Sequence, residues 1–308
     1  MSATMTETAK RLFVSFSGGE TSGYMTYQIL KHWYRRWDEI VVGFANTGAE
    51  NEETLEFVDR CDREFGFKTV WLEAVISPEK GEGTRHRIVD FKTASRNAEP
   101  FREAIKKYGI PNAKYPFCTR ELKLNPMKSF LRSMGWENGT YDTAIGIRAD
   151  EAKRRAKGHI EARIIYLLMD LLPTTKPGIN RWWAVQPFRL ELMGHEGNCK
   201  WCWKKSLRKL LAIMAMHPEK FDFPEEMDAL YSLVGPEFGK PETAPGYKRV
   251  FFRGNLSTAD LRKLCTENTL DLPANDAVAF PMTGELFPLD VEPGGCTETC
   301  EVDFAEAA

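Results

Sequence analysis

Three cysteines have the residue type and the spacing of metal ligands. Cys199 and Cys202 form a Cys-x-x-Cys pair, and Cys118 lies roughly eighty residues earlier. Thiolates are the ligands of iron–sulfur clusters, and a Cys-x-x-Cys pair at the start of a helix would bring two of them to one iron. The pair could instead be half of a zinc site with His195 as a further ligand, and Cys118 could be a small buried apolar residue.

A glycine loop near the N-terminus has the composition of a phosphate-binding loop. Residues 15–22 read Ser-Phe-Ser-Gly-Gly-Glu-Thr-Ser, between an apolar run and an amphipathic stretch. Adjacent glycines let backbone N–H groups turn inward, and a following helix N-terminus adds partial positive charge, so such a loop can hold phosphate oxygens. It is not a Walker loop, because the GxxxxGK spacing is absent. A plain glycine turn between strand and helix is the alternative. The candidate phosphate-binding residues are Ser17, Gly18, Gly19, Thr21 and Ser22.

The elements that must position these residues read as a parallel α/β fold. Strands alternating with helices of ordinary length predict a doubly wound, mostly parallel sheet covered on both faces. The predicted strands are 11–16, 39–45, 68–72 and 141–147. The predicted helices are 23–37, 52–65, 101–108 and 121–134.

The chain divides into two predicted parts, a nucleotide-binding α/β domain over 1–190 and a helical, irregular extension over 191–308 that carries the Cys-x-x-Cys pair. Residues 75–100 are polar and weakly periodic, which predicts an insertion or mobile loop. In the extension, 199–216 and 221–234 read as helices, and the tail from 273 onward, rich in Pro, Gly and acidic residues, reads as irregular.

Composition narrows the functional classes. The chain has 308 residues, of which 43% are hydrophobic and 28% charged, as in an ordinary globular protein. A net charge of −2 gives no whole-molecule attraction to nucleic acid or membranes, so any polyanion site must be a local patch. Residues 1–10 lack a signal-peptide pattern, and the apolar run 164–172 is too short to span a membrane. These features predict a cytoplasmic protein whose seven cysteines are thiols or metal ligands.

The glycine loop and two later segments resemble one superfamily. Strand-SGGxxS-helix is similar to the PP-loop of the adenine nucleotide α-hydrolase superfamily, the ATP pyrophosphatases that include phosphoadenylylsulfate reductases and thiolation enzymes. Asn46-Thr47-Gly48 followed by Glu53-Thr54 resembles its DTG…ET segment, with Asn where Asp is commoner. Residues 146–151, Gly-Ile-Arg-Ala-Asp-Glu, followed by Arg154, resemble its GxRxxE…R segment. Each segment ends a predicted strand, where open α/β sheets bind ligands.

The resemblance implies roles for these residues. It implies ATP with Mg²⁺ as ligand, with Asn46, Thr47 and Gly48 on the adenosine side. Arg148 would stabilise charge at the reacting phosphate, and Glu151 and Arg154 complete the catalytic candidates.

Glu20 departs from the family pattern. Family loops often read SGGKDS or SGGxDS, whereas Glu20 and Thr21 occupy the variable positions here. A carboxylate at Glu20 would oppose a triphosphate unless it points to solvent or helps to hold Mg²⁺. Compensation would then come from Arg148, Arg154 or the metal. A degenerate loop that binds nucleotide without hydrolysing it is the alternative.

The cysteines add a second resemblance. Cys118 and the later Cys-x-x-Cys are similar to the iron–sulfur pattern of assimilatory adenylylsulfate reductases, in which a Cys-Cys pair comes first; Phe117 replaces one member of that pair here. Ligation by Cys118, Cys199 and Cys202 would leave one iron of a [4Fe–4S] cluster open, and the resemblance to cluster-dependent thiolation enzymes suggests a hydrosulfide there. Zinc is the alternative metal.

The other four cysteines divide into two pairs. Cys61 and Cys265 lie in helical patterns and read as structural. Cys296 and Cys300 lie in a tail that lacks the Cys-Gly context in which reductases of this family carry their catalytic cysteine.

These resemblances imply an enzyme that cleaves ATP to AMP and pyrophosphate and transfers sulfur to an adenylated acceptor. Basic residues at 153–157 and 200–209, with tryptophans interleaved, favour tRNA or DNA as the acceptor. The first alternative is a phosphoadenylylsulfate or adenylylsulfate reductase that uses a thioredoxin-like reductant. The second is a nucleotide-binding regulatory module without chemistry. No membrane partner is expected, and the sequence is compatible with a homodimer.

Overall fold

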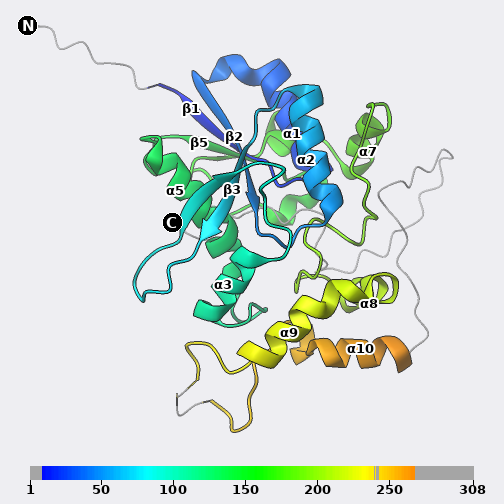
Figure 1. Cartoon of the computed structure of the whole chain (residues 1–308). Helices are drawn as coiled ribbons and strands as arrows, with labels where there is room; N and C mark the ends of the chain where they lie inside the picture. Colours follow the sequence, from blue (N-terminus) through cyan, green and yellow to red (C-terminus); the bar gives the residue numbers. More distant parts are fainter. Residues whose placement is uncertain (1–8, 239, 241–242, 268–308) are drawn as a thin grey trace, which may run out of the picture.

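The computed structural model of the chain describes residues 9–238, 240 and 243–267 (Figure 1). Its centre is a six-stranded sheet with the order β4-β3-β2-β1-β5-β6. Neighbouring strands are parallel except for β3 and β4, which are antiparallel. The strands are β1 Arg11–Ser15, β2 Glu39–Asn46, β3 Val70–Val75, β4 Arg85–Val89, β5 Asp142–Ile145 and β6 Ile164–Ile165.

Helices cover both faces of the sheet because its strands are apolar on both sides. In β1, Leu12 and Val14 pack with α1 (Glu20–Gln28) and α2 (Glu52–Phe65), whereas Phe13 packs on the other face with α5 (Asn125–Ser133). This alternation follows from the two-residue period of a strand. In Figure 1, α1 and α2 lie to the right of the sheet and α5 to its left.

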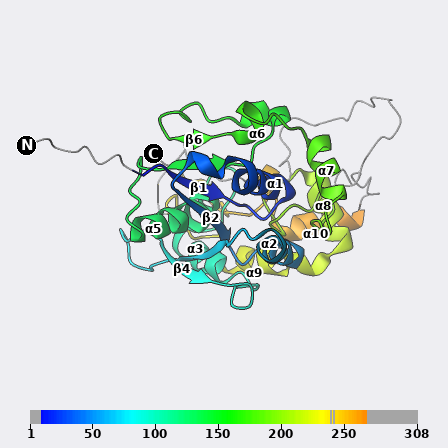
Figure 2. The same ribbon diagram turned by 90° about the horizontal axis from the view of Figure 1, so that it is seen from above.

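The remaining helices complete the α/β layers and form the C-terminal region. Short α6 and then α7 follow β6, and α7 packs beside α1 (Figure 2). A separate apolar cluster joins α3 and α4 to the C-terminal helices α8, α9 and α10. These helices are α3 Glu99–Tyr108, α4 Phe117–Thr119, α6 Leu167–Asp170, α7 Lys176–Ala184, α8 Leu207–Met216, α9 Asp222–Tyr231 and α10 Thr258–Glu267.

The predicted fold class is confirmed: a doubly wound, mostly parallel sheet is followed by a helical region. Two local predictions are wrong. Residues 75–100 are not all loop, because β4 adds an antiparallel edge strand; its side chains alternate poorly because most of them face solvent. Residues 199–205 form turns, and α8 begins only after Ser206, whose hydroxyl accepts a hydrogen bond from the Lys209 N–H. The Cys-x-x-Cys pair therefore precedes the helix by several residues.

Other boundaries differ less. The predicted helix 23–37 begins earlier, at Glu20, and after Gln28 continues as a π-helical turn over Ile29–Trp33. The tail from 273 onward lies outside the described residues, and the domain boundary at 190 stays a prediction. Within the described parts of the chain, none of the helices has the length and apolarity that a membrane crossing requires.

Candidate nucleotide-binding site

The glycine loop between β1 and α1 is held in shape by its own residues. Ser22 Oγ donates to the Gly19 carbonyl (3.0 Å), accepts from the Ser17 N–H (3.2 Å) and lies 2.8 Å from Ser17 Oγ. Gly18 has φ of +80°, and a Cβ there would lie 2.7 Å from Thr54 Cγ2. Ser22 and Gly18 thus fix the loop conformation, and Ser22 is fully buried.

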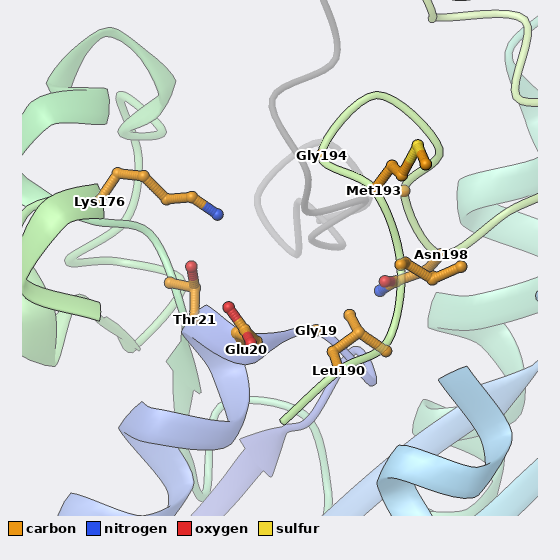
Figure 3. A pocket seen from close by; sticks show the side chains of 10 residues that line it. Gly19, Glu20, Thr21, Lys176, Leu190, Met193, Gly194 and Asn198 are labelled. Atoms are coloured by element: carbon orange, nitrogen blue, oxygen red, sulfur yellow. The ribbon is translucent and has the colours of Figure 1, made fainter. Parts of the chain in front are cut away.

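A pocket that is partly open to solvent lies directly above this loop (Figure 3). Three structural units line it: the start of α1, the start of α7, and the irregular segment that follows α7. The lining residues are Gly19, Glu20, Thr21, Lys176, Leu190, Leu192, Met193, Gly194, Gly197 and Asn198. One side of the pocket is therefore polar and the other largely apolar.

Glu20 is buried beside the pocket and is paired with an arginine that the sequence did not single out. Arg189 Nε and Nη2 donate to the two Glu20 carboxylate oxygens at 2.9 and 3.1 Å. Burial raises the pKa of Glu20, and the hydrogen bond and charge of Arg189 act in the opposite direction. Trp183 Nε1 also donates to the Glu20 carbonyl at 2.8 Å. Arg189 therefore stabilises the ionised carboxylate that the unusual loop sequence introduces.

The GxRxxE segment contacts the glycine loop through a hydrogen bond between Arg148 and Thr21. Arg148 is buried, and its Nη1 donates to Thr21 Oγ1 at 3.2 Å while its Nε donates to Asp150 at 3.0 Å. Glu151 accepts from the Arg148 N–H at 3.2 Å and from Arg154 Nη1 at 2.5 Å. The three predicted catalytic residues thus contact one another, and Arg148 also contacts Thr21 of the pocket lining. Their catalytic roles stay predictions.

Asn46, Thr47 and Gly48 are buried and bonded within the protein. Asn46 Nδ2 donates to Glu73 Oε1 at 2.6 Å, and Thr47 Oγ1 donates to Glu50 at 2.8 Å. Gly48 has φ of +75°, and a Cβ there would lie 2.9 Å from the Ala98 Cα. None of these three residues lines the pocket above the glycine loop. Their assignment to the adenosine side stays a prediction.

The segment 197–200 joins the glycine loop to the cysteine pair. Asn198 Nδ2 donates to the Ser17 carbonyl at 2.7 Å, and the Asn198 carbonyl accepts from the Asn51 N–H at 2.9 Å. Glu50 and Cys199 then form an antiparallel bridge. Cys199 consequently follows directly after a residue that lines the pocket.

The three predicted metal ligands share one packed cluster. Cys199 is buried, whereas Cys118 and Cys202 are half-buried beside the same apolar residues. The five described cysteines form no disulfide, and Cys296 and Cys300 lie outside the described residues. Over the described ranges, no group of three or more His, Cys, Asp or Glu side chains is arranged to hold a metal ion. Within the described part of the chain, the thiols are therefore gathered in one region but do not by themselves make up a three-residue ligand set.

The basic and aromatic residues near the cysteines are less exposed than their sequence pattern indicates. Trp183, Trp201 and Trp203 are buried, and so is Lys205, whose Nζ donates to the Cys199 carbonyl. These indoles cannot stack on a nucleic-acid base without a rearrangement. Lys153 and Lys157 are exposed.

The family comparison covers the glycine loop and the two later segments. The phosphoadenosine phosphosulfate reductase domain model matches residues 11–164, a range that holds all three sequence segments and Cys118. The chain belongs to this family, which implies nucleotide binding. No solved structure matches it significantly.

Relatives cover different shares of the chain. The uncharacterized nin region protein ORF290 of Escherichia phage lambda is 31% identical over 294 residues, which are 94% of each protein. The uncharacterized protein MJ0066 of Methanocaldococcus jannaschii is 32% identical over 149 residues, 48% of this chain and 25% of that protein.

Three residues at the pocket carry no strong sequence signal: Lys176, Arg189 and Asn198. The sequence marks Lys176 only as part of a helix start, because Thr175-Lys176-Pro177 places a proline in the first turn. Arg189 and Asn198 lie in an irregular segment that has no local signal.

Proposed function

We propose that this chain is a PP-loop ATP pyrophosphatase that adenylates an acceptor and releases pyrophosphate. The observation that carries the proposal is the pocket above the glycine loop, with Gly19, Thr21 and Lys176 on its polar side. Leu190, Leu192 and Met193 form its apolar side. A nucleotide has the same division, with charged phosphates at one end and a flat, weakly polar base at the other.

The chain's own residues can perform the binding part of this reaction. Backbone N–H groups at the start of α1 face phosphate oxygens in such loops, and the helix N-terminus favours their charge. Thr21 contributes a hydroxyl to the pocket wall, and Arg148 fixes that hydroxyl through its 3.2 Å hydrogen bond. Arg148 thereby orients a pocket group.

The proposed step is attack of an acceptor oxygen on the α-phosphorus. A new bond forms between that oxygen and phosphorus, the bond to the bridging oxygen of the β-phosphate breaks, and pyrophosphate leaves with the electron pair. A sulfur nucleophile then displaces AMP from the atom that carries the adenylated oxygen, which is carbon in a base carbonyl and phosphorus in a backbone phosphate. The cleavage products of ATP are therefore AMP and pyrophosphate.

Mg²⁺ would neutralise phosphate charge in this step. Among the described residues that line the pocket, Glu20 has the one carboxylate, and both of its oxygens already accept from Arg189. The described residues thus offer no set of protein ligands for the ion. Mg²⁺ would instead reach the pocket bound to the phosphates of the nucleotide.

For the sulfur step we propose a [4Fe–4S] cluster on Cys118, Cys199 and Cys202, with zinc as the alternative metal. Two observations support this proposal. The three cysteines pack among the same apolar residues, and the antiparallel bridge with Glu50 places Cys199 beside the loop after β2. A bound cluster would supply a sulfide-carrying iron. Among the described residues these thiols are not arranged to hold a metal ion, so the proposed cluster rests on the residue types and on their shared surroundings.

Metal analysis tests the cluster proposal. Anaerobically purified protein is expected to carry iron and acid-labile sulfide in similar amounts, with brown absorbance that is lost in Cys199→Ala. The buried Cys61→Ala variant, in α2, is the matched control and should keep the colour. Stoichiometric zinc without sulfide would contradict the cluster.

The proposed acceptor is a base or backbone group of tRNA or DNA. Exposed Lys153 and Lys157 after the GxRxxE segment could contact its phosphates. The sulfur donor is a separate molecule, and a homodimer is compatible with this proposal. Mass spectrometry of nucleosides after incubation with ATP and sulfide should find a thiolated product, and its absence from every nucleic acid offered would contradict this acceptor class.

The second candidate is reduction of phosphoadenylylsulfate or adenylylsulfate, favoured by the family's description. Such a reductase needs a protein thiol and a thioredoxin-like donor. Under the thiolation proposal, the Cys296→Ser, Cys300→Ser double variant keeps ATP-dependent sulfur incorporation and Cys118→Ala loses it. Sulfite release that disappears in the double variant would favour the reductase. Nucleotide binding without turnover of any substrate would favour a regulatory module.

Gly19→Val tests the pocket assignment. Gly19 has φ of −104°, a backbone conformation open to valine, and the melting temperature checks that the variant folds. The added side chain would block the backbone approach to phosphates, and we expect calorimetric MgATP binding to disappear. Unchanged binding would show that the nucleotide lies elsewhere.

A further inference from the structure

The C-terminal end of α1, opposite the pocket, carries a basic and aromatic surface. Residues 31–37 read Lys-His-Trp-Tyr-Arg-Arg-Trp, and none of them is acidic. They continue the π-helical turn that follows α1 into a short 3₁₀ turn, Tyr34–Arg36. The side chains at positions 31, 32, 34, 35 and 36 are all exposed. We call residues 31–36 the basic turn.

Carboxylates do not neutralise the basic turn. Arg35 Nε donates to the hydroxyl of Tyr34 at 3.1 Å, which is a neutral partner. The guanidinium of Arg36 lies over the ring of Trp33, 4.3 Å from its centroid. In the part of the chain that the structure describes, no carboxylate forms an ion pair with Lys31, Arg35 or Arg36. Three positive charges therefore face solvent side by side.

The acidic residues closest in sequence are engaged elsewhere. Asp38 accepts from the Lys10 N–H at 2.8 Å, and Glu39 accepts from Arg11 Nε at 3.2 Å. The net charge of −2 also conceals an uneven distribution. Residues 268–308 contain nine acidic residues and neither lysine nor arginine, so residues 1–267 carry a formal charge of +7. The basic turn is thus the kind of local patch that a polyanion requires.

Aromatic rings connect the basic turn with the pocket along one side of α1. Tyr24 and Tyr27 follow the pocket residue Thr21 at intervals of three, which places them on the same side of the helix. Trp182 packs on both rings, with centroids 5.2 and 4.9 Å away, and Figure 2 shows its helix α7 beside α1. The ring of His32 lies 6.5 Å from that of Tyr27. Tyr24, Tyr27 and Trp182 are half-buried, and we call them the aromatic row.

The length and chemistry of this surface fit a nucleic-acid strand. Thr21 and Lys31 are ten residues apart, which corresponds to about 15 Å of helix. Nucleotides of one B-DNA strand rise about 3.4 Å each, so the surface would span about four or five of them. Ammonium and guanidinium groups bind phosphates, and aromatic rings stack on bases.

We propose that the basic turn and the aromatic row form the surface that holds the nucleic-acid acceptor. Lys31, Arg35 and Arg36 bind its phosphates, and a base stacks on Tyr34, whose side chain is 46% exposed. The strand then runs along α1 toward the pocket, where its reacting group meets the nucleotide. The inference rests on the proposed function, because it takes tRNA or DNA as the acceptor, but the binding itself needs no ATP.

Fluorescence anisotropy with labelled single-stranded DNA and with tRNA, at a series of salt concentrations, tests this proposal on the full chain. Each phosphate contact to a single strand contributes about 0.7 to the slope of log K against log salt. The triple variant Lys31→Gln, Arg35→Gln, Arg36→Gln should therefore reduce the size of that slope by about two and weaken binding about tenfold or more.

Two comparisons make the test specific. The triple variant Lys80→Gln, Lys240→Gln, Lys248→Gln removes three exposed lysines outside the basic turn and should stay within about twofold of the wild type. Tyr34→Ala should weaken binding to single-stranded DNA about fivefold or more, because it removes the stacking ring. Tyr34→Phe, which keeps the ring, should stay within about twofold.

The outcomes separate this surface from the proposed function. Wild-type binding that the Lys31, Arg35 and Arg36 triple variant leaves unchanged would overturn the surface alone. Binding of polyglutamate as tight as that of DNA, with no effect of Tyr34→Ala, would overturn it in favour of an acidic protein partner. Failure of the wild type to bind either nucleic acid would overturn the surface and the acceptor class, whereas calorimetric MgATP binding tests the pocket independently. Melting temperatures check folding, and the Lys31→Gln, Arg35→Gln double variant replaces the triple one if that does not fold.

Discussion

Removal of Arg189 should leave a buried carboxylate without its cation. The Glu20 side chain is only 7% exposed in the wild type, and Arg189→Met removes both hydrogen bonds from the guanidinium. Breaking a fully buried ion pair on one side costs about 3–5 kcal/mol, and an exposed pair contributes at most about 1 kcal/mol. Because Arg189 is itself 23% exposed, an intermediate loss of about 2–3 kcal/mol is expected near neutral pH.

The pH dependence identifies the cause of that loss. Burial already raises the pKa of Glu20 in the wild type, and loss of Arg189 should raise it further. A carboxyl with a higher pKa in the folded than in the unfolded protein stabilises the fold below its unfolded pKa, and this contribution is lost as the pH rises through the folded pKa. The penalty of Arg189→Met should therefore be smaller at about pH 5 than at about pH 8.

Urea unfolding midpoints of four proteins measure this effect: the wild type, Arg189→Met, Glu20→Gln and the double variant. The double variant should recover most of the loss, because no buried charge remains. A penalty of equal size at both pH values, or no recovery in the double variant, would show that Arg189 acts through packing and not through its charge.

Two further substitutions probe the loops beside the pocket. Gly18→Ala should destabilise by about 2–4 kcal/mol in urea unfolding, because its φ of +80° is strained for alanine and its Cβ would lie 2.7 Å from Thr54; Gly66→Ala, at φ of +70° with open space around it, should cost only about 1 kcal/mol. Asn46→Asp should destabilise the fold more at neutral than at acidic pH, since it sets a second buried carboxyl 2.6 Å from Glu73 Oε1; equal stability at both pH values would contradict the hydrogen-bond assignment.

The sequence alone predicts those features of the fold and the site that depend on a local residue pattern. The glycine loop and the segments that begin at Asn46 and Gly146 each follow an apolar strand, and parallel strands bring such ends to one edge of the sheet. The contact between Arg148 and Thr21 shows that two of these segments do meet.

The rest depends on contacts between distant parts of the chain. Arg189 and Asn198 reach the glycine loop from an irregular segment, so no periodicity marks them. β4 escapes prediction because an edge strand with exposed arginines lacks apolar alternation. The pattern of 199–205 predicts a helix, although tertiary contacts, among them the bridge of Cys199 to Glu50, hold this segment in turns.

One residue of the second segment, Asn46, departs from the family's usual pattern. Asn46 stands where the resemblance expects aspartate, and the structure gives a physical reason for the amide. Its Nδ2 donates to Glu73, which also accepts from Arg87. An aspartate at position 46 could not donate this hydrogen bond in its ionised form.

The site of ATP cleavage tests the central claim most directly. Anaerobically purified protein is incubated with Mg²⁺, candidate nucleic-acid acceptors, sulfide and ATP radiolabelled at the α-phosphate, and adenylylsulfate with a thiol donor is tested in parallel. Cleavage between the α- and β-phosphates predicts labelled AMP with an equal amount of pyrophosphate, both absent in Gly19→Val. Labelled ADP, or sulfite from adenylylsulfate without any AMP from ATP, would contradict the account.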